Sequence, residues 1–83
     1  MSLTVVLRVT ATADLARLRG ADKDAFRRAR RAVASLAADP RPDGAVPWGN
    51  SGIWRLHAGD VRVVYEVDED AEAVYILSVG IVS

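Results

Sequence analysis

Hydrophobic and polar residues alternate most clearly over Ile53–Val67, whose sequence is IWRLHAGDVRVVYEV. Gly59 and Asp60 interrupt this β-prone run, and a Gly-X pair in a two-residue loop is typical of a type II′ hairpin turn. Because successive side chains of a strand point to opposite faces, the hairpin has two different surfaces. One is hydrophobic and collects Trp54, Leu56, Val61, Val63, Tyr65 and Val67, whereas the other is basic and collects Arg55, His57 and Arg62. The hydrophobic surface must be buried.

The turns also predict which residues lie opposite each other. An acidic segment over residues 68–72 indicates a second turn, and a last strand is expected over Ala73–Val79. The register expected from both turns pairs His57 with Arg62, Arg55 with Val64, Tyr65 with Tyr75, and Arg62 with Ser78. The two turns agree, which predicts a three-stranded meander with Arg62 on its middle strand.

The N-terminal residues predict a strand followed by a short helix. Leu3–Val9 is rich in β-branched residues and alternates roughly, which favours a strand. Thr10 or Thr12 can cap a short helix over about residues 13–19, and Gly20 ends it.

A longer helix is predicted from an Asp22 cap to about Ala38, where Asp39-Pro40 ends it. Its apolar residues form one stripe at helical spacing: Phe26, Ala29, Val33, Leu36 and Ala37. Three arginines lie off that stripe: Arg27, Arg28 and Arg31. They form either a solvated helix face or a docking surface for an acidic partner segment.

Residues 39–52 contain all three prolines and three of the six glycines, which predicts a loop. Trp48 is expected to order this loop by folding back on the core. Together the elements read β-α-α-β-β-β. We therefore expect an α+β fold in which two N-terminal helices pack on one face of a small, mostly antiparallel sheet and leave the other face open.

Composition narrows the classes of function. At 83 residues the chain is expected to form one domain, residues 1–83, with a single core. It has no cysteine and one histidine, so a disulfide framework and a thiolate metal site are excluded and a zinc site is disfavoured. We expect neither a metal nor another cofactor. Without a signal-peptide pattern or an apolar run near the roughly 20 residues of a membrane span, the expected location is the cytoplasm, away from the membrane.

The charge is zero overall but unevenly distributed. Residues 1–47 carry nine basic and five acidic side chains, whereas the rest of the chain carries two basic and six acidic ones. The excess of four positive charges in the first part indicates an acidic partner. The balanced total does not indicate a dedicated nucleic-acid-binding domain, which is usually strongly basic.

The basic face of the hairpin suits phosphate chemistry. The guanidinium groups of Arg62 and Arg55 can form paired hydrogen bonds to phosphate oxygens and stabilise charge in phosphoryl transfer. His57 can move protons near neutral pH, since the unperturbed pKa of histidine is about 6.5, and Glu66 is a weaker candidate for a general base. This set fits RNA cleavage by a 2′-hydroxyl that attacks its own phosphate. The same residues also fit solvated side chains on a half-buried sheet, and spacing alone does not separate the two interpretations.

Several motifs resemble the RelE/ParE superfamily of bacterial type II toxins. They are DPRP at the end of the second helix, W-R-L in the first hairpin strand, GDVRVVYEVD across the turn and second strand, and SVG in the last strand. The resemblance covers about residues 3–80. It implies the β-α-α-β-β-β fold and a toxin that an antitoxin wraps and holds inactive, in a complex that binds its own operator DNA.

Within this superfamily RelE-like toxins cleave mRNA in the ribosomal A site, whereas ParE-like toxins block DNA gyrase. By resemblance, Arg62 matches the strand arginine that contacts the scissile phosphate. Arg55 and His57 fall where RelE-like nucleases place residues for charge stabilisation and proton transfer. Ser78 is either a second ligand of the RNA phosphate or a small polar neighbour of Arg62. The resemblance favours a metal-independent endoribonuclease that acts on ribosome-bound mRNA, inhibits translation and arrests growth.

The resemblance also implies an antitoxin partner, and the chain departs from the family pattern at its C-terminal residues. An amphipathic, acidic antitoxin segment is expected to lie over Arg27, Arg28 and Arg31 and along an exposed sheet edge. Relatives usually continue after SVG with a basic pair and a tyrosine, where this chain has IVS. That departure predicts attenuated cleavage, or a natural C-terminus elsewhere. It leaves two alternatives to the nuclease, namely a gyrase inhibitor and a degenerate protein that only binds antitoxin.

Overall fold

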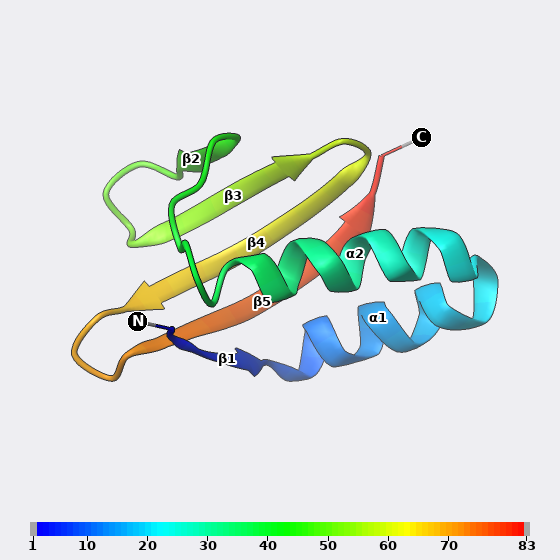
Figure 1. Cartoon of the computed structure of the whole chain (residues 1–83), viewed down its shortest axis with the longest axis horizontal. Coiled ribbons are helices and arrows are strands. Elements are labelled where there is room, and N and C mark those ends of the chain that lie inside the picture. The colour runs from blue at the N-terminus through cyan, green and yellow to red at the C-terminus, as the bar shows by residue number, and fades with distance from the viewer. Residues whose placement is uncertain (1, 83) are drawn as a thin grey trace.

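A five-stranded sheet organises the protein in the computed structural model, which describes residues 2–82. In chain order the elements are β1 (Thr4–Leu7), α1 (Val9–Ala21), α2 (Lys23–Ser35), β2 (Ala45–Pro47), β3 (Ile53–Ala58), β4 (Val61–Asp68) and β5 (Ala73–Ile81). The strands lie in the order β1-β5-β4-β3-β2, with β1 parallel to β5 and all other neighbours antiparallel. Both helices lie on one face of the sheet (Figure 1), which confirms the predicted α+β fold.

The β3–β4 hairpin has the register that the sequence predicts. Gly59 has a φ of 62° whereas Asp60 keeps a negative φ, as a type II′ turn requires. The pairs include His57 with Arg62 and Arg55 with Val64. The hydrophobic surface of the hairpin faces the helices, and the basic surface faces away from them.

The register between β4 and β5 differs from the prediction. A β-bulge next to Val64 and Tyr65 places Val64 opposite Ser78 and Tyr65 opposite Ile76, and Leu77 is the extra residue. The expected pairs of Tyr65 with Tyr75 and of Arg62 with Ser78 are therefore wrong, and Arg62 pairs with Gly80. The extra residue shifts the alternation of side chains along β5, so that both Ile76 and Val79 are buried although they are three residues apart. Of the C-terminal IVS, Ser83 lies outside the described residues.

Helix α1 begins four residues earlier than predicted. The strand expected to reach Val9 ends at Leu7, and the helix expected over about residues 13–19 spans Val9–Ala21. Arg8 is the N-cap and makes no side-chain capping bond, so neither Thr10 nor Thr12 caps this helix. The Arg8 backbone instead joins the two elements, because its N–H donates to the Ile76 carbonyl and its carbonyl accepts from the Thr12 N–H.

Helix α2 begins at the predicted cap. The Asp22 carboxylate accepts hydrogen bonds from the backbone N–H groups of Asp24 and Ala25, each at 3.1 Å. The helix ends at Ser35, earlier than the expected Ala38, because the Leu36 and Ala37 N–H groups bond to carbonyls three residues back rather than four. Neither described helix combines the length and the apolar character that crossing a membrane requires.

The core lies between the two helices and the inner face of the sheet, and α1 contributes Ala11 and Leu15 to it. Its largest fully buried side chains are Tyr65, Leu36, Ile76, Val61, Val63 and Val74. The Tyr65 hydroxyl donates a 2.6 Å hydrogen bond to the Pro40 carbonyl, so the core residue also holds the loop after α2. Burial raises the pKa of Tyr65 to about 12, because the phenolate would lose its hydration.

The loop over residues 39–52 contains a strand that the sequence did not predict. Val46 pairs with Arg55, and Pro47 pairs with Trp54, at the free edge of the sheet where a proline is tolerated. Trp48 was expected to fold back on the core and does not, since 53% of it is exposed. With only three residues and one proline, β2 carries too little periodicity to be recognised.

Candidate functional site

The candidate site is the outer face of the sheet, on the side away from the helices. Register places His57, Arg62 and Gly80 in one row across β3, β4 and β5. Arg55, Val64 and Ser78 form the next row. The structure thus brings the three basic candidates together: His57 is directly opposite Arg62, and Arg55 is its diagonal neighbour.

Ser78 shares this face but does not lie where the sequence placed it. The bulge puts Gly80 opposite Arg62 and moves Ser78 to the diagonal position. A Cβ added to Gly80 would meet no atom within 4 Å, so there is open space beside the Arg62 row. The space suits a ligand that approaches Arg62 from β5, with Ser78 at its border.

The Arg62 side chain is held at the hairpin turn by two backbone acceptors. Its Nη1 donates to the Gly59 carbonyl at 2.7 Å and to the Val61 carbonyl at 3.0 Å. Within residues 2–82, its Nε and Nη2 have no hydrogen-bond acceptor. One nitrogen therefore anchors the guanidinium, and the Nε–Nη2 edge is left to bind an oxyanion through two parallel hydrogen bonds.

His57 and Arg55 project from the exposed side of β3. The His57 backbone N–H donates to the Gly44 carbonyl at 3.0 Å, which fixes the strand position of the imidazole. The Arg55 guanidinium lies 5.2 Å from the ring centroid of Trp48. No group of three His, Asp or Glu side chains in the described part of the chain could hold a metal ion. This face offers positive charge, hydrogen-bond donors and one imidazole, and the Glu66 carboxylate lies on it in the row beyond Arg55, opposite Ile53.

The three arginines of α2 differ in their partners. Arg27 pairs with Asp24 at 2.9 Å, one turn back on the same helix. Arg28 forms a forked pair with Asp60 of the β3–β4 turn, through Nε at 3.1 Å and Nη2 at 2.8 Å. Arg31 has no ion pair within residues 2–82. Arg28 thus fastens α2 to the hairpin, while the charge of Arg31 is left without an ion pair in the described part of the chain.

The Arg28–Asp60 pair also shifts the pKa of both side chains. The hydrogen bonds from Arg28 lower the pKa of the Asp60 carboxyl, and the same bonds raise the pKa of Arg28. Both side chains remain partly exposed, so water screens their attraction.

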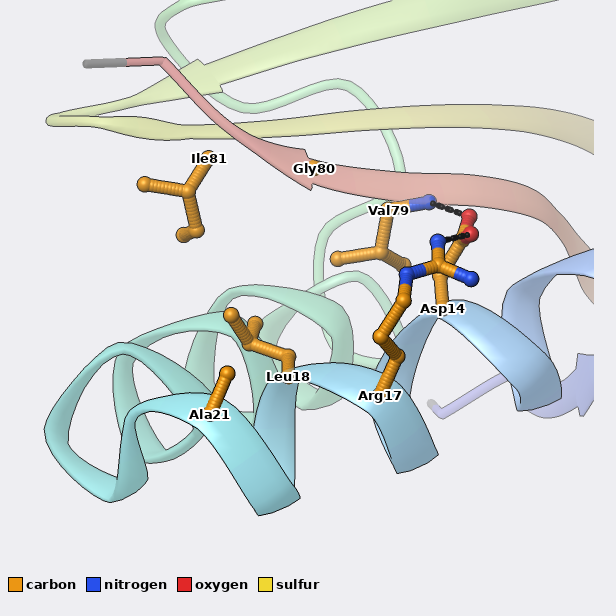
Figure 2. Close-up of a pocket in the computed structure, with 7 residues that line it drawn as sticks. All are labelled: Asp14, Arg17, Leu18, Ala21, Val79, Gly80 and Ile81. Carbon is orange, nitrogen blue, oxygen red and sulfur yellow. Dashed lines mark hydrogen bonds and ion pairs between the residues drawn. The ribbon is translucent and has the colours of Figure 1, made fainter.

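A pocket of about 280 Å³ lies between α1 and the C-terminal part of β5 (Figure 2). Asp14 reaches from α1 to the strand, where its carboxylate accepts the Val79 N–H at 3.0 Å and the Arg17 guanidinium at 2.6 Å. Leu18, Ala21 and Ile81 form the apolar part of the pocket. Asp14 therefore covers an edge N–H of β5 beyond the end of β1. Sequence reasoning missed it, because a lone acid on a helix carries no sign of a distant strand partner.

A second, larger hollow of about 410 Å³ lies on the helix side of the molecule. Its apolar lining comes from β1, α1 and α2, and Arg30 lies at its border. The lining residues are Val5, Leu7, Leu15, Val33, Ala34 and Ala37. We call this hollow the helix groove. It combines apolar surface with positive charge, and the sheet separates it from Arg62.

Comparison with known proteins identifies relatives of both the sequence and the fold. A family model described as "ParE toxin of type II toxin-antitoxin system, parDE" matches residues 5–82. The toxin–antitoxin complex RelBE2 of Mycobacterium tuberculosis contains a chain with 23% identity and a TM-score of 0.83, and the match covers 98% of this chain and 99% of that one. No curated protein sequence matches significantly.

Two further solved structures have the same fold. The YoeB/ParE toxin of Agrobacterium tumefaciens has 14% identity and a TM-score of 0.81, over 98% of this chain and 100% of that one. The isolated RelE toxin of E. coli has 15% identity and a TM-score of 0.80, over 99% of this chain and 86% of that one. At such identities the structural likeness establishes the fold, and the family model establishes the family.

Proposed function

This chain belongs to the ParE toxin family of type II toxin–antitoxin systems, and on that premise we propose that it acts as a RelE-like, ribosome-dependent mRNA endonuclease that inhibits translation. The observation that carries the proposal is that Arg55, His57 and Arg62 occupy neighbouring positions on the same outer face of the sheet. Such a cluster supplies cations for a phosphate and a group that moves protons.

In the proposed reaction the 2′-hydroxyl of one nucleotide attacks the phosphate that follows it. The O2′–P bond forms and the P–O5′ bond breaks, which leaves a 2′,3′-cyclic phosphate and a free 5′-hydroxyl. One proton leaves the 2′-oxygen and one proton must reach the departing 5′-oxygen. His57 serves one of these two transfers, as general base or as general acid. Atoms and charges balance without any further reactant.

Arg62 and Arg55 stabilise the negative charge that accumulates on the phosphate. The Nε–Nη2 edge of Arg62 can hold two of its oxygens, because Nη1 already anchors the group to the turn. Arg55 adds a second positive charge from the neighbouring strand. Ser78, diagonal to Arg62, is placed to donate a weaker hydrogen bond to the same phosphate.

The decisive experiment is cleavage of a ribosome-bound mRNA by the purified chain. We expect breaks within the A-site codon, and a loss of rate of about 10²–10³ in Arg62→Ala, the size seen when one charge-stabilising donor is removed. Arg19→Ala removes an exposed arginine of α1 on the other side of the sheet and is the matched control. Cleavage at the same rate in Arg62→Ala, or none by the unchanged chain, would contradict the proposal.

A second candidate function is inhibition of DNA gyrase by binding. The family model favours it, since the model carries the name of the ParE toxins. The direct assay is supercoiling of a relaxed plasmid by gyrase in the presence of the purified chain. Inhibition together with an uncut A-site codon would assign the chain to the gyrase class, and cleavage without inhibition would assign it to the nuclease class. Absence of both effects would leave a degenerate toxin that only binds antitoxin.

For each of these activities we propose a cognate antitoxin as the partner. The RelBE2 relative is a toxin–antitoxin complex, and this chain presents the helix groove with Arg30 and Arg31 close by. An amphipathic, acidic helix would bury its apolar face in the groove and pair its acids with the arginines. The proposed complex, rather than the toxin alone, binds operator DNA.

Titration of the antitoxin at two salt concentrations tests this docking surface. We expect Arg31→Ala to weaken binding and to reduce its salt dependence, because Arg31 has no ion pair within residues 2–82. Arg27→Ala should have a smaller effect, since Arg27 already pairs with Asp24. Identical affinity and salt dependence in the triple Ala variant of Arg27, Arg28 and Arg31 would place the antitoxin elsewhere.

A further inference from the structure

Trp48 is a large aromatic side chain that the core does not use. Although 53% of it is exposed, the backbone around it is well fixed. Its N–H donates to the Ile53 carbonyl at 2.8 Å, and its carbonyl accepts the Ser51 hydroxyl at 2.7 Å. The Ser51 oxygen also accepts the Ile53 N–H at 3.2 Å. The indole is therefore presented to solvent by a small, ordered turn rather than by a loose loop.

The ring is also paired with a cation on the candidate face. The Arg55 guanidinium lies 5.2 Å from the Trp48 ring centroid, and Arg55 is a diagonal neighbour of Arg62 on the outer face. By contrast, Trp54 is half-buried, and the guanidinium near its ring belongs to Arg41 of the preceding loop. The chain thus has one tryptophan that belongs to the fold and one that lies beside the basic cluster.

An exposed indole beside arginines fits single-stranded nucleic acid. Unpaired bases stack on aromatic rings and on guanidinium planes, while the phosphates bind the same cations. The outer face supplies both kinds of group, because Arg62 offers a free edge for a phosphate and Trp48 lies two strands away across Arg55. Charge complementarity on this face favours a polyanion over an acidic helix, which finds its apolar groove on the opposite side.

We propose that Trp48 and Arg55 form a stacking platform for one unpaired base of the RNA whose phosphate binds at Arg62. This inference rests on the proposed nuclease function and adds a residue that positions the substrate. Trp48 lies beside Ile53 at the start of β3, whereas the Arg62 guanidinium lies at the turn that follows this strand. The base on the platform therefore belongs to a nucleotide further along the same RNA strand, and its stacking fixes the position of the RNA on this face. Trp48 contributes stacking without charge, whereas Arg55 contributes stacking and charge. Substitutions of Trp48 and Arg55 are therefore expected to differ in their effect on the salt dependence of RNA binding.

Tryptophan fluorescence offers a direct test, because the chain has two tryptophans. Trp54→Phe leaves Trp48 as the single tryptophan, which can be excited selectively over the two tyrosines, and keeps an aromatic ring in the half-buried position. A short 2′-O-methyl oligoribonucleotide serves as the probe, since it lacks the attacking hydroxyl and cannot be cleaved by the proposed route. We expect saturable quenching of Trp48. No quenching at any attainable concentration of the probe would overturn the proposal.

Affinities of a dye-labelled version of the same oligonucleotide separate the roles of the two side chains. Trp48→Ala should weaken binding about five- to 150-fold, the range for loss of one base stack, and leave the salt dependence unchanged. Arg55→Ala should weaken binding and also reduce the slope of log affinity against log salt by about 0.7. Trp54→Phe and Arg19→Ala should bind like the unchanged chain. Equal affinity in Trp48→Ala and the unchanged chain would overturn the proposal.

The cleavage assay distinguishes failure of the platform from failure of the nuclease function. If the chain leaves ribosome-bound mRNA uncut and yet binds the probe through Trp48, the nuclease proposal fails and the platform stands. If the chain cleaves and Trp48→Ala cleaves and binds equally well, the platform alone fails. A Trp48→Ala variant that loses antitoxin affinity and keeps RNA affinity would assign the indole to the protein interface, which also overturns the platform.

Discussion

The two faces of β4 show how one strand serves two purposes. Val61, Val63 and Tyr65 point to the helices and are at most 1% exposed. Arg62, Val64 and Glu66 alternate with them on the outer face and remain half-buried. The inner-face residues contribute mainly to stability, whereas the outer-face residues include the candidate site. Because the two groups contact opposite sides of the sheet, a substitution on one face should leave the role of the other face largely intact.

The largest effect is expected on the inner face, at Tyr65. Tyr65→Ala removes a fully buried ring and should lower the free energy of unfolding by about 3–5 kcal/mol. Tyr65→Phe keeps the ring and loses the hydrogen bond to Pro40, so its effect should be about 1 kcal/mol. Urea denaturation of the two variants measures both. A similar loss in the two variants would show that the hydroxyl, rather than the ring, dominates.

The same residue predicts a loss of stability in alkali. Tyr65 ionises at about 12 in the folded protein and at 10.0 in its reference state. A folded-state pKa above the unfolded one contributes stability that is complete below pH 10 and is lost as the pH rises towards 12. Unfolding midpoints of the unchanged chain should therefore fall across this window, and those of Tyr65→Phe should fall less. Parallel curves would contradict the assignment to Tyr65.

Two glycines lie at the two ends of the row that contains His57 and Arg62, Gly44 beside His57 and Gly80 beside Arg62. Gly44 has a φ of 89°, and a Cβ there would lie 2.7 Å from the His57 carbonyl oxygen. Gly44→Ala should therefore lower the free energy of unfolding by about 1–3 kcal/mol, from backbone strain and displacement of β2. Gly80→Ala meets open space and should change it by less than about 0.5 kcal/mol. Thermal unfolding of the pair measures the difference, and equal losses would refute the geometry of the row.

A smaller effect is expected where α1 meets the edge of β5. Asp14→Ala leaves the Val79 N–H without its carboxylate acceptor and should lower the free energy of unfolding by about 1 kcal/mol. Water in the adjacent pocket can replace part of that bond. Hydrogen exchange at Val79 reports the change directly, because its amide should exchange faster in the variant. An unchanged exchange rate would mean that Asp14 does not protect this edge.

The smallest effect is expected at the exposed Arg28–Asp60 pair. The pKa of Asp60 is lowered in the folded protein, so the pair stabilises the fold above the unfolded pKa of 3.8 and ceases to do so as the pH falls through the folded value. Asp60→Asn should therefore be slightly less stable than the unchanged chain at pH 7, and the difference should shrink as the pH falls below 3.8 through the lowered pKa of Asp60. Asp70→Asn, in the exposed turn after β4, is the control without this pair. A difference that does not shrink as the pH is lowered would implicate turn geometry instead.

The parts of the fold that depend on turn residues, alternation and a helix cap were predictable from the sequence. The Gly59-Asp60 turn and the alternation around it fixed the hairpin register, and with it the grouping of His57 and Arg62. The Asp22 cap fixed the start of α2. In β5 nearly every residue is apolar, so the pattern could not reveal a bulge at Leu77. Helix α1 starts after Arg8, which makes no side-chain cap that a sequence could signal.

The candidate site was predictable in part for the same reason. Arg55, His57 and Arg62 belong to the hairpin, whose geometry follows from alternation. Trp48 lies in a segment rich in glycine and proline, where its direction depends on hydrogen bonds to Ser51 and Ile53 that have no periodic signature. The Arg28–Asp60 pair joins residues 32 positions apart, and such contacts follow only from the assembled fold.

The bulge in β5 restricts how such a chain can vary between relatives. Leu77 has no partner residue on β4. The number of residues in β5 therefore determines which face of the sheet each later side chain occupies. A deletion of one residue here would turn every later side chain of the strand over, exposing Val79 and burying its neighbours. The length of this segment is therefore constrained in addition to the apolar character of its buried positions, Val74, Ile76 and Val79. The turn at residues 49–52, which joins the edge strand β2 to β3, has far more freedom to lengthen or shorten.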